Sequence, residues 1–454
     1  MNTVHSGSTN GHHPNSERSL ALRRAAKASF IGNFIEWFDY ASYGYLVTVI
    51  GHAFFPEADK SVQLLSTYAV FAMSFILRPI GAVVWGAWGD RWGRRWALSW
   101  SILIMSGSTF FIGLLPTYSV IGMASAIGLL VLRMIQGFSA SGEYAGAGTF
   151  LAEYAPPSRR GIYTSLVPAS TACGLLAGSL TVTGMFTVLS DNAINTWGWR
   201  VPFLLAGPLG LIGRYIRVHL EDSPAYQEMR AEIPQEQKAA SWSEPLRLLL
   251  REHLRETLIT FGVSCLNAVA FYMLLTYMPT YVHEELKFSQ DTSTLATSVM
   301  LVVYIAAIFI MGHLSDSFGR RRMLIAACVA FIALTIPLFV VMTKAAGVLV
   351  AVILCEIVFA IALTANDGTL ATFLAESFPT NVRYSGFALS FNGANALLGG
   401  TTPFIVTWLI KVTGSPLAPA VYLTVIALIA MVAIFRSRTI HGSELTEEQA
   451  QPGA

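Results

Sequence analysis

The sequence predicts an all-α integral membrane protein in which twelve transmembrane helices form two six-helix halves. The 454 residues are 54% hydrophobic and only 12% charged, whereas soluble domains carry about 25% charged residues. Apolar runs of about 20 residues, the length that crosses a bilayer, recur along the whole chain. Two sequence motifs each occur twice, once in each half of the chain. These observations together favour many membrane spans over a single anchor.

The apolar runs place the helices one by one. The expected spans are 28–52, 62–87, 97–115, 120–152, 161–188, 201–218, 254–280, 292–314, 323–343, 348–376, 384–411 and 418–436. The expected divisions are a disordered cytoplasmic N-terminus at 1–27, a first bundle at 28–218, a cytoplasmic linker at 219–253, a second bundle at 254–436 and a cytoplasmic tail at 437–454. No signal peptide is expected, because the first apolar run is long and contains two acids.

The lysines and arginines predict which side of the membrane each loop faces. An even number of spans places both termini on one side. If that side is the cytoplasm, five of the 29 basic residues lie on outer loops and two within the membrane, which leaves 22 on inner segments. This excess follows the positive-inside rule. The outer five are Lys60, Arg200, Lys287, Lys344 and Lys411.

Internal repeats support the division into halves. The segment from Gly86 to Arg95, GAWGDRWGRR, recurs as GHLSDSFGRR from Gly312 to Arg321. The tripeptide Leu-Ala-Glu that ends at Glu153 recurs in the second half, where it ends at Glu376. Each first motif follows the second helix of its half, and each second motif follows the fourth. Two equivalent halves around a midplane site are the architecture of many secondary transporters.

The fourth span carries unusual charges. The segment 132–153 contains Arg133 and Glu143 among many glycines, alanines and serines. A charge in the membrane costs about 2.5–3.5 kcal/mol on insertion scales, so it survives where it faces protein or a water-filled cavity. On one helix the two residues are about 15 Å apart and within about 80° of each other. They either line one cavity at different depths or form a buried structural ion pair.

The repeated motif G-x-x-x-D-x-x-G-R-R resembles the loop signature of the major facilitator superfamily. That resemblance implies a cytoplasmic gate, with a turn that only anchors the loop as the alternative. The expected gate residues are Asp90, Arg95, Glu153, Asp316, Arg321 and Glu376. Asp90 and Asp316 are acids able to interact with a helix N-terminus, and Arg95 and Arg321 are the expected partners of Glu153 and Glu376.

Three further stretches resemble the metabolite:proton symporter family. They are GNFIEWFD at 32–39, RPIG at 78–81 and RMIQGFSASGE at 133–143. The stretches 272–281 and 378–385 are most similar to its proline/glycine-betaine branch. The resemblance implies the major facilitator fold, a bacterial inner membrane and proton-driven import of a small metabolite. About 18 residues follow the last span, without the heptads of the coiled coil that some members of that branch carry, so osmotic regulation is not expected.

Coupling to protons needs a buried carboxyl that can bind and release a proton. Glu143 is the first candidate, followed by Asp39 and Glu36, which share a helix face. Arg133 is the candidate to bind a substrate carboxylate or to hold Glu143 ionised. Arg78 precedes Pro79, so the alternative for it is to stabilise a kinked helix. The second half contributes the intramembrane acids Glu356 and Asp367, with Asn366 adjacent.

Aromatic residues are interleaved with these charges. Trp37, Tyr40 and Tyr144 are candidates for a cage around a quaternary ammonium group, and interfacial belts are the alternative. Two intramembrane arginines, outnumbered by acids, suit a zwitterion better than a citrate-like trianion. Asn267, Asn392 and Asn395 either orient the substrate or join helices by hydrogen bonds.

The sequence argues against other classes of protein. It has no cofactor fingerprint, no phosphate loop and no metal-ligand spacing, so no enzyme, cofactor or metal is expected. The net charge of +2 says nothing about nucleic acid, but the charges follow the membrane topology rather than form a binding patch, so no nucleic-acid partner is expected. The expected partners are a small solute, protons and the lipid bilayer, with no obligate protein partner. The leading expectation is import of proline or glycine betaine. The alternatives are a citrate or 2-oxoglutarate symporter, an exporter, and a membrane sensor that transports nothing.

Overall fold

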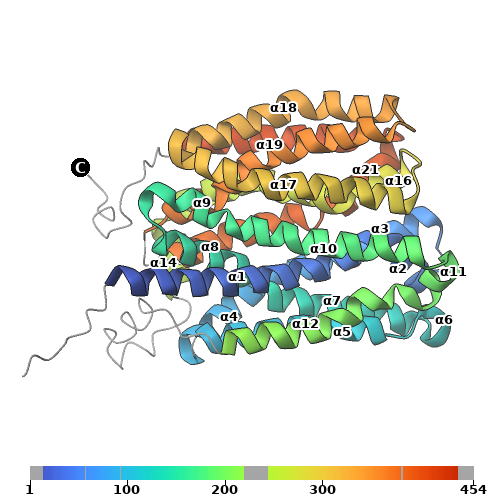
Figure 1. Ribbon diagram of the computed structural model, residues 1–454, viewed down its shortest axis with the longest axis horizontal. Helices are drawn as coiled ribbons and strands as arrows, with labels where there is room; N and C mark the ends of the chain where they lie inside the picture. The colour runs from blue at the N-terminus through green and yellow to red at the C-terminus, as the bar shows by residue number, and fades with distance from the viewer. Residues whose placement is uncertain (1–13, 57, 93, 219–243, 380–381, 438–454) are drawn as a thin grey trace, which may run out of the picture.

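A computed structural model describes residues 14–218 except 57 and 93, and residues 244–437 except 380 and 381. Within these ranges the chain is a bundle of helices without strands (Figure 1). Nine helices in the described ranges are long and apolar enough to cross a membrane, and Ser99–Leu114 is a shorter apolar helix. Residues 1–13 and 438–454 of the termini, and residues 219–243 of the expected linker, lie outside the described residues.

The first half contains the six spans that its apolar runs predict. Its helices are α1 (Pro14–Tyr45), α2 (Val47–Phe54), α3 (Lys60–Ile76), α4 (Arg78–Trp92), α5 (Arg94–Leu114), α6 (Tyr118–Ile121), α7 (Met123–Ala140), α8 (Glu143–Tyr154), η1 (Pro157–Arg159), α9 (Arg160–Thr164), α10 (Leu166–Val188), α11 (Asp191–Ala193), η2 (Ile194–Gly198) and α12 (Arg200–Val218). Four of the spans are each divided into two helices, at Leu46, Leu77, residues 141–142 and Ser165.

The second half begins after α14 (Glu244–Glu252) and again has six spans. Its helices are α15 (Leu254–Phe271), η4 (Tyr272–Tyr277), α16 (Met278–Glu284), α17 (Gln290–Phe318), α18 (Arg320–Lys344), α19 (Leu349–Glu376), α20 (Arg383–Ala394), η5 (Asn395–Gly399), α21 (Thr402–Thr413) and α22 (Ala418–Arg436). The segments η4 and η5 are π-helical turns inside the first and fifth spans of this half. Such turns are found mostly at functional sites.

The expectation of disorder up to residue 27 is wrong from Pro14 onwards. The helix α1 begins at Pro14 and runs into the first span without a break. Residues 17–27, ERSLALRRAAK, are mostly Ala, Leu, Arg, Glu and Lys, which have high helix propensity. They therefore extend the membrane helix beyond its apolar part, which is all that hydropathy detects.

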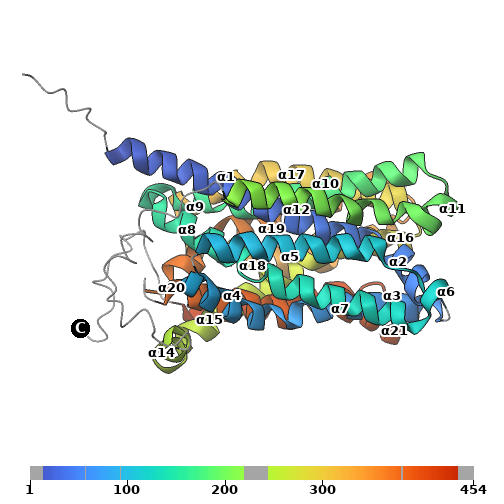
Figure 2. The same cartoon turned by 90° about the horizontal axis from the view of Figure 1, so that it is seen from below.

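The two halves lie side by side along their length (Figures 1 and 2). In Figure 1, α5, α7 and α12 lie along one side and α17, α18 and α19 along the other. Between them α10 packs against both α1 of its own half and α17 of the other. We call the end of the bundle that carries α8, α9 and α14 the α14 end, and the opposite end, with α2, α6 and α16, the α6 end.

The helix α14 in the expected linker packs against the second half. Leu249 on α14 is fully buried and forms a small apolar cluster with Phe378 and Val382, between α19 and α20. The linker is thus ordered where it meets the bundle, because α14 has an apolar face to bury.

Helices of the first half approach very closely around the fourth span. A Cβ on Gly137 of α7 would lie 1.7 Å from the carbonyl oxygen of Ser74, and one on Gly81 of α4 would lie 2.1 Å from that of Phe138. Small residues at such positions let helix backbones pack together in a membrane. The abundance of small residues in this span is therefore explained by packing.

We expect Gly137→Ala to lower the free energy of unfolding by about 1–3 kcal/mol, because the Ser74 backbone must shift to admit the methyl group. The check is thermal unfolding of the purified protein in detergent. Gly107→Ala is the matched control, since a Cβ there meets nothing within 4 Å. Equal melting temperatures for the two variants would contradict this account of the packing.

Candidate functional site

A buried ion pair joins the first two spans. The guanidinium of Arg78, at the start of α4, donates to Glu36 on α1 at 2.5 Å. Both side chains are almost fully buried. The Arg78 guanidinium also lies over the rings of Tyr40 and Phe75, at 5.0 and 4.7 Å from their centroids. Arg78 therefore joins α1 to α4 next to the break at Leu77.

Arg133 starts a second buried polar chain. Its guanidinium donates to Gln136 on the same helix, α7. Gln136 donates to Thr109 of α5 at 2.9 Å, and the Thr109 hydroxyl donates to Asp39 of α1 at 3.1 Å. The chain links the guanidinium of Arg133 to the carboxylate of Asp39 through two neutral groups. The partner found for Arg133 among the described residues is thus Gln136 rather than Glu143, and a role in binding a substrate carboxylate stays a prediction.

Aromatic rings surround the two arginines. The Arg133 guanidinium lies 4.2 Å from the ring centroid of Tyr43 and 5.0 Å from that of Tyr40. Tyr40 thus lies against both guanidinium groups, and such cation–π contacts are worth about 2 kcal/mol when desolvated. The Nε and Nη2 atoms of Arg133 are buried and have no hydrogen-bond partner among the described residues. These donors remain available to an anionic group.

Glu143 lies away from Arg133. The fourth span breaks at residues 141–142, and Glu143 begins the separate helix α8. The sequence predicts that Arg133 and Glu143 share one face of a continuous helix. That placement is wrong because the chain turns between α7 and α8. The half-buried Glu143 instead borders a small cavity of about 10 Å³ together with Glu36. Two candidate proton carriers therefore share one cavity.

In the second half, Asp367 of α19 is held by three donors. The hydroxyl of Tyr304 donates to one carboxylate oxygen at 2.5 Å. The amides of Asn267 and Asn366 donate to the other oxygen at 2.7 and 3.2 Å. The side chain is buried, and each of its two oxygens accepts at least one of these hydrogen bonds. The acid is thus a fixed acceptor in the middle of the bundle.

Asp367 borders a central cavity of about 10 Å³ between the two halves, with room for about one water molecule. Four aromatic rings form part of its wall. Trp37 and Phe271 meet across the halves with centroids 4.8 Å apart, and Tyr144 stacks on Phe391 at 4.2 Å. The cavity is lined by Trp37, Tyr144, Pro168, Thr171, Asn267, Phe271, Asp367, Phe391 and Asn395.

The sequence marks Asp367 as an intramembrane acid without assigning it a role in the site, and it does not single out Phe271 or Phe391. The repeat contained a signal for one of them. The alignment of the halves that places Glu153 opposite Glu376 also places Tyr144, which was a candidate, opposite Asp367. Applying that alignment to each candidate of the first half points to its counterpart in the second.

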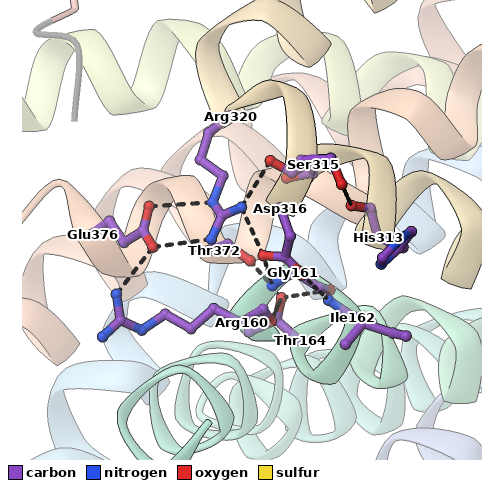
Figure 3. A network of polar contacts seen from close by, with 12 residues as sticks. Arg160, Gly161, Ile162, Thr164, His313, Ser315, Asp316, Arg320, Thr372 and Glu376 are labelled. Atoms are coloured by element: carbon purple, nitrogen blue, oxygen red, sulfur yellow. Dashed lines mark hydrogen bonds and ion pairs between the residues drawn. The ribbon is translucent and has the colours of Figure 1, made fainter. Parts of the chain in front are cut away.

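At the α14 end, Asp316 connects the second half to the first (Figure 3). Its carboxylate accepts from the backbone N–H groups of Gly161 and Ile162, in the first turn of α9, at 2.8 and 3.1 Å. Arg320 forms an ion pair with the same carboxylate at 2.7 Å. An acid at this place suits the positive end of the helix formed by α9 and α10. The expected contact between Asp316 and a helix N-terminus is confirmed.

Glu376 is the centre of the same network (Figure 3). It pairs with Arg160 of the first half at 3.2 Å and with Arg320 of the second at 3.3 Å, and its side chain is buried. The prediction that Arg321 is the partner of Glu376 is wrong. Arg321 instead donates to the carbonyl oxygens of Ile434 and Phe435, at the end of α22. Successive residues on a helix point about 100° apart, and it is Arg320 that faces inwards.

Glu153 forms a second bridge between the halves at this end. It pairs with Arg383 of α20 at 3.0 Å, and its expected contact with Arg95 stays a prediction. The Glu153 side chain is 35% exposed, whereas Arg383 is buried. The side chains of Asp90 and Arg95 lie outside the described part of the structure, although their backbones belong to α4 and α5.

Contacts between the halves also close the α6 end. Tyr45 of α1 donates to the carbonyl oxygen of Leu275 at 2.7 Å. The hydroxyls of Tyr68 and Thr280 are 2.8 Å apart, and Ser179 and Ser298 are 2.6 Å apart. The two halves are therefore in contact at both ends of the bundle, on either side of the small central cavity.

The described residues contain no group of three or more His, Cys, Asp or Glu side chains that could hold a metal ion. The four cysteines are unpaired. The site thus contains an acid, Asp367, beside aromatic rings in the middle of the bundle. The first half adds the two buried guanidinium groups, and ion pairs join the halves at the α14 end.

The sequence matches the Sugar (and other) transporter family over residues 25–450. The chain belongs to this family of membrane transporters. It is 38% identical over 418 residues to the proline/betaine transporter of Salmonella typhimurium, covering 90% of this chain and 82% of that protein. It is 38% identical over 416 residues to the glycine betaine/proline/ectoine/pipecolic acid transporter OusA of Dickeya dadantii, with the same coverage. It is also 33% identical over 413 residues to a putative proline/betaine transporter of Staphylococcus aureus, covering 91% and 87%.

Solved structures agree with the fold of the transporter. The proton:xylose symporter XylE, a major facilitator superfamily protein, superposes with a TM-score of 0.73 at 18% identity, covering 92% of this chain and 95% of that one. Its partially occluded inward-open form gives 0.71, covering 92% and 97%. The twelve-helix, two-half major facilitator fold expected from the sequence is thus confirmed, and the chain is a multi-pass membrane transporter rather than an enzyme.

Proposed function

We propose that the protein imports a small zwitterion of the proline and glycine betaine type together with protons. It does so across a bacterial inner membrane, with both termini in the cytoplasm. The observation that carries the proposal is the central cavity, where the carboxylate of Asp367 lies beside the rings of Trp37, Tyr144, Phe271 and Phe391. An acid next to aromatic rings suits a quaternary or secondary ammonium group. The names of the relatives point to the same class of solute.

The arginines of the first half suit the other end of a zwitterion. Trp37 lines the cavity, and its ring lies 5.5 Å from that of Tyr40, which contacts both Arg78 and Arg133. The ring of Tyr40 thus lies between Trp37 in the cavity wall and the two guanidinium groups. In the proposed complex the ammonium group faces Asp367 and the carboxylate faces this positive side.

A solute of this class is larger than the cavity, so binding requires one end of the bundle to open. Alternating access follows if the two ends open in turn. The ion pairs of Glu376 and Glu153 then form the cytoplasmic gate at the α14 end, which carries most of the basic residues. The contacts of Tyr45 and Tyr68 form the outer gate at the α6 end.

Glu143 is the first candidate for the proton carrier of the first half, and Asp39 and Glu36 are the second candidates. Glu143 and Glu36 border one small cavity, so two of the candidate carriers lie at one place in the first half. A proton that crosses about 150 mV releases about 3.5 kcal/mol. That free energy supports a solute gradient of a few hundredfold.

The test is uptake of labelled glycine betaine, proline, citrate and 2-oxoglutarate by cells that lack their own carriers, with and without a protonophore. We expect betaine or proline uptake that the protonophore abolishes and that falls at least tenfold in Glu143→Gln. Uptake of citrate or 2-oxoglutarate alone would refute the substrate class. Uptake that the protonophore leaves unchanged would refute proton coupling.

A further inference from the structure

Glu356 is a buried acid that the mechanism above does not use. It lies in α19, its side chain is fully buried, and neither of its carboxyl oxygens has a hydrogen-bond partner among the described residues. None of the ion pairs found in the described ranges includes it. An isolated carboxylate buried in this way is far less stable than the neutral acid.

Its position in the repeat is informative. The alignment of the halves that places Glu153 opposite Glu376, and Tyr144 opposite Asp367, places Arg133 opposite Glu356. The second half thus has a fully buried acid at the place where the first half has a fully buried cation. Eleven residues separate Glu356 from Asp367, about 16 Å along the helix and on nearly the same face. Glu356 therefore lies between the central cavity and the α6 end.

The surroundings of Glu356 connect it to the outer gate. Tyr45 of α1 lies within electrostatic range of its carboxyl group, and so does Cys355 of its own helix. The Tyr45 hydroxyl donates to the Leu275 carbonyl oxygen across the two halves. When the α6 end opens, Tyr45 must leave, and water from that side reaches Glu356.

We propose that Glu356 is a second proton site of the transporter, in the second half. With the α6 end open, the carboxylate takes one proton from water. The neutral acid then allows the gate to close over it, and it returns the proton to water that enters from the central cavity when the α14 end opens. This inference rests on the proposed proton-coupled import and assigns one of its steps.

Glu356→Gln tests the inference, because glutamine has the shape of the protonated acid but cannot release a proton. In proteoliposomes we expect exchange of labelled for unlabelled glycine betaine, with no proton gradient, to stay within about threefold of wild type. Accumulation driven by a pH gradient should fall at least tenfold. Glu252→Gln, an exposed acid on α14, is the matched control and should leave both rates unchanged. Accumulation by Glu356→Gln at the wild-type rate would overturn the inference.

Infrared difference spectroscopy gives a readout that depends neither on transport nor on the identity of the solute. We expect purified wild-type protein at neutral pH to show the carbonyl stretch of a buried protonated carboxylic acid, and Glu356→Gln to lack it. Glu356→Asp, which keeps a titratable group, should retain a shifted band and serves if the glutamine variant does not fold. A wild-type spectrum that contains no such band would refute the protonated state even if betaine transport is demonstrated. The band without betaine transport would refute the proposed substrate and keep the proton site.

Discussion

Replacing Asp367 with asparagine is expected to lower kcat/KM for glycine betaine at least 100-fold. The change removes the negative charge that faces the ammonium group in the cavity. It also replaces one carboxylate oxygen by an NH₂ group, although Tyr304, Asn267 and Asn366 all donate to that carboxylate. A donor would then face a donor in a buried site, where an unmade hydrogen bond costs about 1–3 kcal/mol. A 100-fold loss corresponds to about 2.7 kcal/mol.

Initial rates of betaine uptake over a range of concentrations measure this effect, with thermal unfolding as the check on folding. Asn366→Ala is the matched control, because it removes the weakest of the three hydrogen bonds, at 3.2 Å, and keeps the charge. It should reduce kcat/KM by less than tenfold. If Asp367→Asn transports betaine within threefold of wild type while it remains folded, Asp367 does not bind the substrate.

Glu376→Gln is expected to favour opening of the α14 end. The substitution leaves Arg160 and Arg320 in the closed interface without their shared carboxylate. Removing one partner of a buried ion pair costs about 3–5 kcal/mol. The penalty falls on the closed state, because opening lets water reach both guanidinium groups. The population of the open state should therefore rise by more than tenfold.

A cysteine at Thr372 reports on this opening. The Thr372 hydroxyl lies 2.5 Å from that of Thr164 in the closed interface, so a maleimide reaches Cys at this position only when the halves separate. In inside-out vesicles, with the four native cysteines replaced, Glu376→Gln should raise the labelling rate at least tenfold. Glu153→Gln should raise it less than threefold, since that carboxylate is 35% exposed and exposed pairs contribute little. Equal labelling of all variants would argue against a gate at Glu376.

Hydropathy predicted the spans well because the bilayer imposes the same length and composition on each of them. The expected span 418–436 coincides with α22, and 348–376 differs from α19 by one residue. Hydropathy could not reveal the irregular turns inside the spans, such as the break at residues 141–142 and the π-helical turn of η4. Those breaks keep the chain apolar, and they depend on packing against other helices rather than on local composition.

The candidate site was predictable in its residue types and less so in its pairings. Glu36, Arg78 and Arg133 are buried at the centre of the first half, as intramembrane charges should be. Which of two adjacent arginines faces Glu376 depends on the rotation of α18, which the motif G-R-R does not encode. The alternative that pairs Arg133 with Glu143 depended on one continuous helix, whereas the chain breaks before Glu143.

The pair of Glu36 with Arg78 constrains the order in which the protein enters the membrane. During synthesis the first span emerges with two acids and no cation of its own at that depth, and its counterion follows 42 residues later in the second span. An unpaired acid in lipid is costly, so the first span is stable there only once the second has joined it. The two spans are thus integrated as one hairpin. The polar chain from Asp39 to Arg133 also needs Thr109 of the third span, so it is completed only when the fourth span arrives.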